Sequence, residues 1–167
     1  MNNMKEIRIE KVTLNIGTGE AGGKLEKAMK LLQNLSNQKP VATITKKRIP
    51  TWGVRPGTTI GAKVTLRKNK DVLVENMLKA AGNKLNQKKI GEGNFSFGIP
   101  EYINVPGSKY DLSIGIIGFG VMVTLERNGF RIKKRAVKKG KIPQRHLISK
   151  QETIDFLKNK FKTKIED

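Results

Sequence analysis

Within residues 38–68, two segments of alternating apolar and polar residues are separated by a long basic loop, and this pattern limits the folds open to the chain. Along residues 60–67, apolar side chains occupy every second position and polar or cationic ones lie between, which is the period of a half-buried strand. Residues 41–46 alternate in the same way, with Ala42 and Ile44 expected on the core side, and their Val and Thr content favours a strand. Two such strands predict a sheet with one buried face and one polar face.

A third alternating segment, residues 7–16, slips by one position at residues 10–11, which predicts a β-bulge. The polar positions of residues 11–16, 41–46 and 60–67 carry no acid, although the chain contains 14 Asp and Glu residues. A merely solvated face would mix acids and bases, so we interpret this face as a surface that binds RNA. Its candidate contact residues are Lys11, Thr13, Asn15, Thr43, Thr45, Lys63, Thr65 and Arg67.

The connection between the two central strands, residues 47–57, is far longer than an ordinary hairpin loop. It contains basic residues and no acid, and a loop this long in a compact domain usually has a function. Its cations suit phosphate neutralisation. The single tryptophan, Trp52, either stacks on a base or ribose or folds back onto the protein core. The candidate residues are Lys46, just before the loop, and Lys47, Arg48, Trp52 and Arg55 within it, and we call residues 46–57 the basic loop.

Helical spacing of apolar residues predicts amphipathic helices over residues 25–36 and 74–86, which gives the order β-α-β-β-α. Glycines and prolines then multiply, and the remaining elements are expected to be short. We predict extended segments at residues 94–99, 102–105 and 114–126, and a C-terminal helix over residues 150–163 that begins with a capping box.

Residues 131–150, called here the basic segment, hold nine basic residues and no acid. The segment has too little apolar content to fold by itself. We expect it to contact RNA through Arg131, Lys133, Lys134, Arg135, Lys138, Lys139, Lys141 and Arg145.

Net charge narrows the class of partner. The chain carries 34 Lys and Arg against 14 Asp and Glu, a net charge of +20, and such self-repulsion is relieved by a polyanion, which predicts nucleic acid. No stretch approaches the ~20 apolar residues of a spanning helix, so no membrane partner is expected. The absence of cysteine leaves no disulfide, thiolate nucleophile or Cys-ligated zinc. We expect one intracellular domain over residues 1–167.

One motif points elsewhere. Gly17-x-Gly19-x-x-Gly22 lies between a predicted strand and helix and matches the dinucleotide-binding fingerprint. Glu20 would oppose a pyrophosphate, and residues 27–70 offer no acid for a ribose, so a tight turn is the better interpretation. An NADP-binding enzyme stays open as an alternative, because the basic residues that begin the loop suit a 2′-phosphate.

The sequence offers little support for other catalytic residues. His146 lies among basic residues, and Glu152 and Asp155 are better interpreted as cap and dipole partners of a helix than as an acid/base pair. No metal-ligand cluster is present in the sequence, and no cofactor is expected. The leading hypothesis is a non-enzymatic RNA-binding protein, and a general RNA chaperone stays open beside it.

Blocks along nearly the whole chain resemble, in order and spacing, the family of large ribosomal subunit protein five, in its archaeal and eukaryotic branch. In the first half these are LNIGTGEA at 14–21, QKPV at 38–41, TKK at 45–47, GVRPG at 53–57 and IGAKVTLR at 60–67. In the second half they are NFSFGI at 94–99, INVPG at 103–107, VTLERNG at 123–129 and IP at 142–143.

The resemblance implies an α+β domain whose antiparallel sheet is covered by helices on one side, in a cytoplasmic ribosome. It implies binding to 5S rRNA at the central protuberance, with Asn15, Gln38 and Thr65 among the contacts. The basic loop would reach P-site tRNA, the basic segment would contact large-subunit rRNA, and a bridge would form to protein thirteen of the small-subunit head. No small-molecule substrate is implied, and the glycine motif would be a turn.

Overall fold

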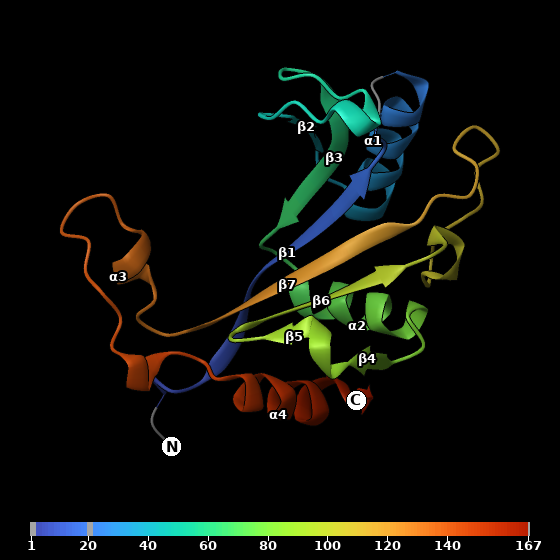
Figure 1. Ribbon diagram of the computed structural model, residues 1–167. Coiled ribbons are helices and arrows are strands. Elements are labelled where there is room, and N and C mark those ends of the chain that lie inside the picture. The colour runs from blue at the N-terminus through green and yellow to red at the C-terminus, as the bar shows by residue number, and fades with distance from the viewer. Residues whose placement is uncertain (1–2, 20–21, 167) are drawn as a thin grey trace.

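The computed structural model describes residues 3–19 and 22–166, apart from the side chain of Trp52. A six-stranded sheet, entirely antiparallel in its described pairings, has the order β2-β3-β1-β7-β6-β5 (Figure 1). Its strands are β1 (Ile7–Gly17), β2 (Val41–Ile44), β3 (Thr59–Leu66), β5 (Ile90–Gly91), β6 (Asn94–Ile99) and β7 (Phe119–Arg127). A separate parallel pair joins β4 (Lys84–Asn86) to β8 (Lys164–Glu166).

Helices cover one face of this sheet. In Figure 1, α1 (Gly23–Ser36) and α2 (Lys70–Ala80) lie behind the strands, and α4 (Lys150–Phe161) runs along the β5 edge. A short α3 (Arg131–Lys134) follows β7 within the basic segment. The predicted α+β class, the one-sided helix layer and the initial β-α-β-β-α order are confirmed.

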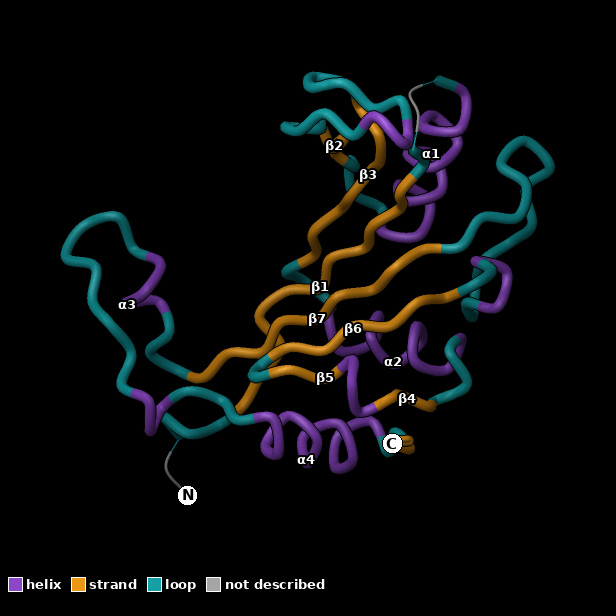
Figure 2. The backbone as a smooth tube through the Cα atoms, in the orientation of Figure 1, coloured by secondary structure: helices purple, strands orange, loops and turns teal. Residues whose placement is uncertain are grey.

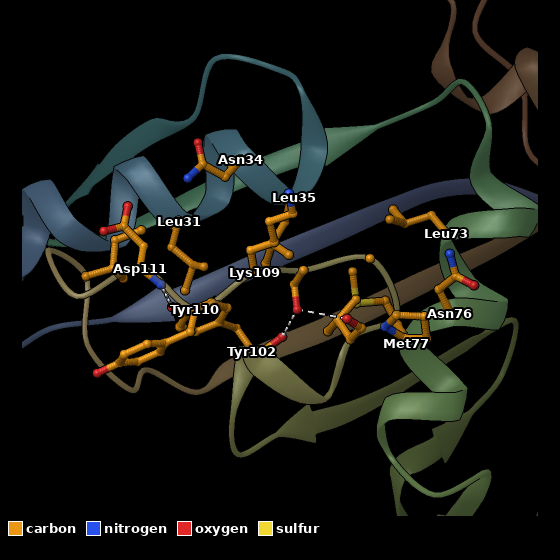
Figure 3. A pocket seen from close by; sticks show the side chains of 15 residues that line it. Leu31, Asn34, Leu35, Leu73, Asn76, Met77, Tyr102, Lys109, Tyr110 and Asp111 are labelled. Carbon is orange, nitrogen blue, oxygen red and sulfur yellow. Dashed lines mark hydrogen bonds between the residues drawn. The ribbon is translucent and has the colours of Figure 1, made fainter.

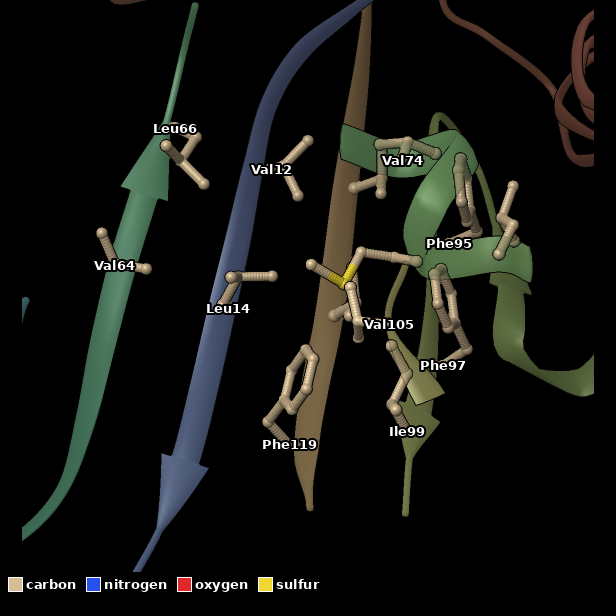
Figure 4. Close-up of a cluster of buried hydrophobic side chains, with 14 of the residues drawn as sticks. Val12, Leu14, Val64, Leu66, Val74, Phe95, Phe97, Ile99, Val105 and Phe119 are labelled. Carbon is tan, nitrogen blue, oxygen red and sulfur yellow. The ribbon is translucent and has the colours of Figure 1, made fainter. Parts of the chain in front are cut away.

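The core follows the predicted alternation. Val12 and Leu14 of β1 and Val64 of β3 are at most 3% exposed and point toward the helices with Phe119 and Phe95 of the neighbouring strands (Figure 4). Burying one such side chain contributes about 1.5–3 kcal/mol, so this continuous cluster provides most of the force that holds sheet and helices together.

The bulge predicted at residues 10–11 is confirmed. The β1–β7 register shifts between Ile9, which pairs with Leu125, and Lys11, which pairs with Thr124. The extra residue lets Ile9 and Val12 both enter the core although three positions separate them.

The expected core position of Ile44 is wrong. Ala42 pairs with the fully buried Ala62, as the alternation requires, but the β2–β3 register shifts between Thr43 and Ile44. Ile44 is consequently 62% exposed.

Two predicted helix ends are also wrong. Helix α2 stops at Ala80, because Gly82 and Asn83 adopt positive φ angles of 73° and 58° that no helix continues. Leu85 is buried instead as part of β4. Helix α4 ends at Phe161, where a left-handed Lys162 closes it.

Two expectations around residue 110 need correction. Residues 102–105 form a 3₁₀ turn (Tyr102–Asn104) instead of an extended segment, and β7 begins at Phe119 instead of residue 114. Gly118, just before β7, packs closely against another part of the backbone, since a Cβ there would lie 2.6 Å from the carbonyl oxygen of Pro100.

Candidate nucleic-acid interface

The residues predicted to bind RNA gather on the sheet face that no helix covers. In the β1–β3 register Thr13 lies opposite Thr65 and Asn15 opposite Lys63, and directly opposed residues project to the same side. Lys11 lies two residues before Thr13 on the same side of β1, opposite Thr124 of β7. Lys63 is exposed and the others are partly exposed. We call these residues, with Val41, Thr43 and Met122 described next, the open face.

Sequence reasoning missed the apolar members of this surface. Met122 lies opposite Thr13 and is 42% exposed, and Val41 lies opposite Lys63 and is 59% exposed. Thr43 lies beside them, opposite Gly61. The open face therefore combines cations and hydroxyls with apolar groups that suit contact with ribose or a base.

Acids appear only at one end of this surface. Glu126 lies opposite Arg8 and pairs with it at 3.0 Å, and Lys134 joins Glu10 and Glu126 at 2.6 and 3.3 Å. Both carboxylates are largely buried, with side chains 15% and 17% exposed. Because each is ion-paired, the open face from Lys11 to the β2 edge remains without unpaired negative charge.

Three further candidates lie at the edges of the open face. Arg67 is exposed directly after β3, and Gln38 is exposed just before β2. Thr45 also has partners within the protein, because its Oγ1 donates to the carbonyl oxygens of Arg55 at 2.6 Å and Thr58 at 3.1 Å. That hydroxyl closes the basic loop.

The basic loop projects beyond the sheet, at the top of Figure 2. A 3₁₀ turn, Pro50–Trp52, sits inside an isolated bridge between Ile49 and Val54, and Val54 is 3% exposed. The question whether Trp52 stacks on RNA or on the core lies outside the described residues. Four cations are exposed and, within the described chain, form no ion pair: Lys46, Lys47, Arg48 and Arg55.

The basic segment forms a loop at the opposite end of the sheet, at the left of Figure 1. Residues 131–139 are all exposed. Lys134 is occupied by the two glutamates, and Arg135 donates from Nε to the carbonyl oxygen of Lys138 at 2.6 Å. The other predicted contacts are exposed: Arg131, Lys133, Lys138, Lys139, Lys141 and Arg145.

A third loop, residues 106–118, exposes large apolar side chains that sequence reasoning did not single out. Leu112 is 85% exposed, Ile116 64% and Tyr110 53%. We call this the apolar loop. The exposure of these side chains could not be predicted from a local sequence pattern, because it is apparent only once the positions of the core residues are known.

The apolar loop is held against α1. Asp111 pairs with Lys30 at 3.0 Å, and its backbone N–H donates to the Tyr102 hydroxyl at 2.9 Å. Hydrogen bonds from Ser113 and Lys30 lower the pKa of Asp111 to about 2. A cavity of about 530 Å³ lies between this loop, α1 and α2 (Figure 3).

The glycine motif lacks the surroundings of a dinucleotide site. Gly19 and Gly22 have positive φ angles of 75° and 116°, as in a tight turn, whereas Glu20 lies outside the described residues. Strand β1 pairs antiparallel with both β3 and β7. A dinucleotide fold needs parallel neighbours at this point, so the NADP alternative loses its structural basis.

Groups weighed for catalysis have structural partners. His146 Nε2 lies 2.9 Å from the Asn128 carbonyl oxygen, and Glu152 both caps α4 and pairs with Arg127. In the part of the chain that is described, no three His, Asp or Glu side chains gather closely enough for a metal ion. Within the same part, no helix combines the length and apolarity needed to cross a bilayer.

Comparison with known proteins identifies the family. Residues 2–55 match the family model described as Ribosomal protein L5, and residues 59–156 match the model of the C-terminus of the same ribosomal family. Large ribosomal subunit protein uL5 of Nanoarchaeum equitans is 50% identical, with 92% of each chain covered. The uL5 proteins of Sulfurisphaera tokodaii and Methanococcus maripaludis (strain C6) are 48% and 46% identical, covering 99% and 97% of this chain and 95% and 92% of theirs. These three relatives are archaeal, in line with the branch that the sequence blocks resemble. The chain therefore belongs to the ribosomal protein L5 family.

Proposed function

We propose that this chain is a structural protein of the large ribosomal subunit and that its open face binds 5S rRNA. The observation that carries the proposal is the register that sets Thr13, Asn15, Lys63 and Thr65 side by side on a face that no helix covers. Nothing in this function requires a catalytic group.

The chemistry of the open face fits folded RNA. The Lys63 ammonium neutralises phosphate, and the release of counterions supplies most of the binding free energy. An A-form helix displays 2′-hydroxyls along a wide, shallow minor groove. Short side chains such as Thr13, Thr65 and Asn15 let the backbone of the sheet approach these hydroxyls closely.

The two cationic loops point to different RNA partners. The basic loop projects beyond one end of the sheet with four unpaired cations, so we assign it to the elbow of P-site tRNA. The basic segment extends from the other end, and we assign it to large-subunit rRNA. The sheet between them would anchor 5S rRNA to the body of the subunit at the central protuberance.

The apolar loop suits a protein partner. Leu112 and Ile116 are exposed hydrophobic side chains on a loop that is tied to α1 and extends beyond the sheet at the right of Figure 1. An apolar contact with a polar rim is the usual chemistry of a protein interface. We assign it to the bridge with protein thirteen of the small-subunit head.

The 5S assignment is tested by removing one cation of the open face, Lys63, and one at its edge, Arg67. Lys63→Ala with Arg67→Ala should weaken 5S rRNA binding. The plot of log K against log salt should become less steep, by about one in slope for each lost phosphate contact. The matched control is Lys27→Ala with Lys158→Ala, which removes the same charge from exposed positions on α1 and α4. Filter binding across a salt series measures both.

Equal losses in the two double variants would mean that only net charge matters, and the assignment of the open face would fail. An unrelated RNA of the same length is the second comparison. A general RNA chaperone would bind it as tightly as 5S rRNA, whereas the proposed function requires weaker binding.

A further inference from the structure

A buried arginine joins the two ends of the basic segment. Arg127 is the last residue of β7 and only 5% exposed. Its Nη1 donates to the carbonyl oxygens of His146 at 3.3 Å and Leu147 at 3.1 Å. The chain therefore leaves the sheet at Arg127 and returns, about twenty residues later, to the same guanidinium.

Glu152 completes this junction. Its Oε1 accepts a hydrogen bond from Arg127 Nη2 at 2.6 Å, and its Oε2 accepts one from the backbone N–H of Ser149 at 2.9 Å. The hydrogen bond from Ser149, assisted by Arg127, holds the pKa of Glu152 below its ordinary value, so the carboxylate is charged at neutral pH. One side chain thus caps α4 and neutralises the buried arginine.

Further contacts fix the shape of the loop above the junction. His146 Nε2 lies 2.9 Å from the carbonyl oxygen of Asn128, and its ring packs edge-on against Phe130 at 5.7 Å between centroids. Lys134 ties one side of the loop to the sheet. The backbone N–H of Gly140 donates to the carbonyl oxygen of Ile132 at 3.2 Å across the loop.

These contacts act against strong self-repulsion. Residues 131–139 are all exposed and six of them are Lys or Arg, so an untethered segment would expand. A loop already held in its bound shape loses less conformational entropy when RNA binds.

We infer that Arg127 and Glu152 form a clamp that holds the basic segment in one shape before RNA binds. They are positioning residues for RNA binding, and neither touches RNA. The inference rests on the proposed contact between the basic segment and large-subunit rRNA.

The free wild-type protein gives the first test. Hydrogen exchange should show protection, well above that of an unstructured peptide, at the hydrogen-bonded amides of Arg135 and Gly140. Exchange as fast as in an unstructured peptide would overturn the inference without any variant.

The second test removes the clamp. Arg127→Met with Glu152→Gln leaves no buried charge unpaired, and trypsin should then cleave within residues 131–145 faster than in wild type. Affinity for large-subunit rRNA assembled with 5S rRNA should fall by about tenfold, because the loop must be ordered on binding. The salt slope should stay unchanged, since every cation of the loop remains. Lys79→Met, which breaks an exposed ion pair with Glu75 on α2, is the matched control and should change neither readout.

A neutralised loop separates this inference from the proposed function. Replacing Lys133, Lys139 and Lys141 with Gln should lower both affinity and salt slope, and adding the clamp substitutions should then cost little more affinity. If the neutralised protein binds like wild type, the proposed rRNA contact fails. If it binds weakly but the clamp variant with all its loop cations binds like wild type, the contact stands and the clamp inference is overturned.

Discussion

Gly61 shows how one residue controls the close packing of three strands. It sits in β3 between β1 and β2, and a Cβ there would lie 2.6 Å from the carbonyl oxygen of Ile16 and 3.0 Å from Thr43 Oγ1. Gly61→Ala should lower the free energy of unfolding by about 1–3 kcal/mol, since the strands must move apart to admit the methyl group. Urea denaturation measures the loss.

Gly98 provides the comparison within the same sheet. It lies in β6, and a Cβ there would meet no atom within 4 Å. Gly98→Ala should be neutral or slightly stabilising, because alanine restricts the unfolded chain more than glycine does. If both substitutions changed stability equally, the close approach at Gly61 would be refuted.

Glu152 gives stability a dependence on acid pH. Its pKa is lowered in the folded protein, from an ordinary value of 4.5, chiefly by the hydrogen bond from the Ser149 backbone. Its contribution is therefore present above about pH 4.5 and is lost as pH falls through the folded-state pKa. In Glu152→Gln, the free energy of unfolding should fall less steeply with decreasing pH over this range. Identical pH profiles of the two proteins would show that the carboxylate makes no net contribution.

At the level of elements, the alternation of apolar and polar residues predicted the strands well. It does so because it depends on a local property, namely that one face of each strand is buried in the core. It placed Lys63 and Thr65 on the open face and located the bulge beside Ile9. It failed where backbone conformation or a distant partner decides. Helix α2 ends before Leu85 because of two positive φ angles, and β7 begins only after Gly118, which packs against a carbonyl oxygen.

The same division explains the candidate site. The cations of the open face could be found from the sequence because they occupy alternate positions along the strands. The apolar Met122 and the paired Glu126 were missed because their places depend on how β7 pairs with β1, more than a hundred residues away. Arg127 was missed for the same reason, since its partners begin nineteen residues later in the chain.

The basic loop and the open face should act independently, because they lie on different elements. Lys47→Ala with Arg48→Ala should leave 5S rRNA affinity nearly unchanged. In assembled subunits it should weaken P-site tRNA binding about two- to thirtyfold, since each of the two exposed charge contacts contributes ~0.2–1 kcal/mol. Loss of 5S binding with normal tRNA binding would mean that the two surfaces are assigned the wrong way round.

At the scale of the whole molecule, acids and bases are mixed on the helices but not on the proposed RNA-binding surfaces. Helix α1 carries Glu26 and Lys30, and α2 carries Asp71, Glu75 and Lys79. The cations of the open face and of the basic loop form no ion pair within the described chain. The loops project in different directions from one packed core (Figure 2). This arrangement suits a protein that holds separate RNA elements at fixed positions.

The net charge of +20 predicts opposite effects of salt on folding and on binding. Screening the self-repulsion should raise the free energy of unfolding of the free protein as ionic strength increases, because the Debye length shrinks from ~30 Å at 0.01 M to ~10 Å at 0.1 M. As ionic strength increases, RNA affinity should fall instead. The loss should be on the order of 10³- to 10⁵-fold between 50 and 200 mM salt if about 6 to 10 phosphates are neutralised. Denaturation and filter binding in the same buffers measure the two effects. A flat binding curve beside rising stability would show that the cations repel one another but do not contact phosphates, which would remove the electrostatic basis of the proposed function.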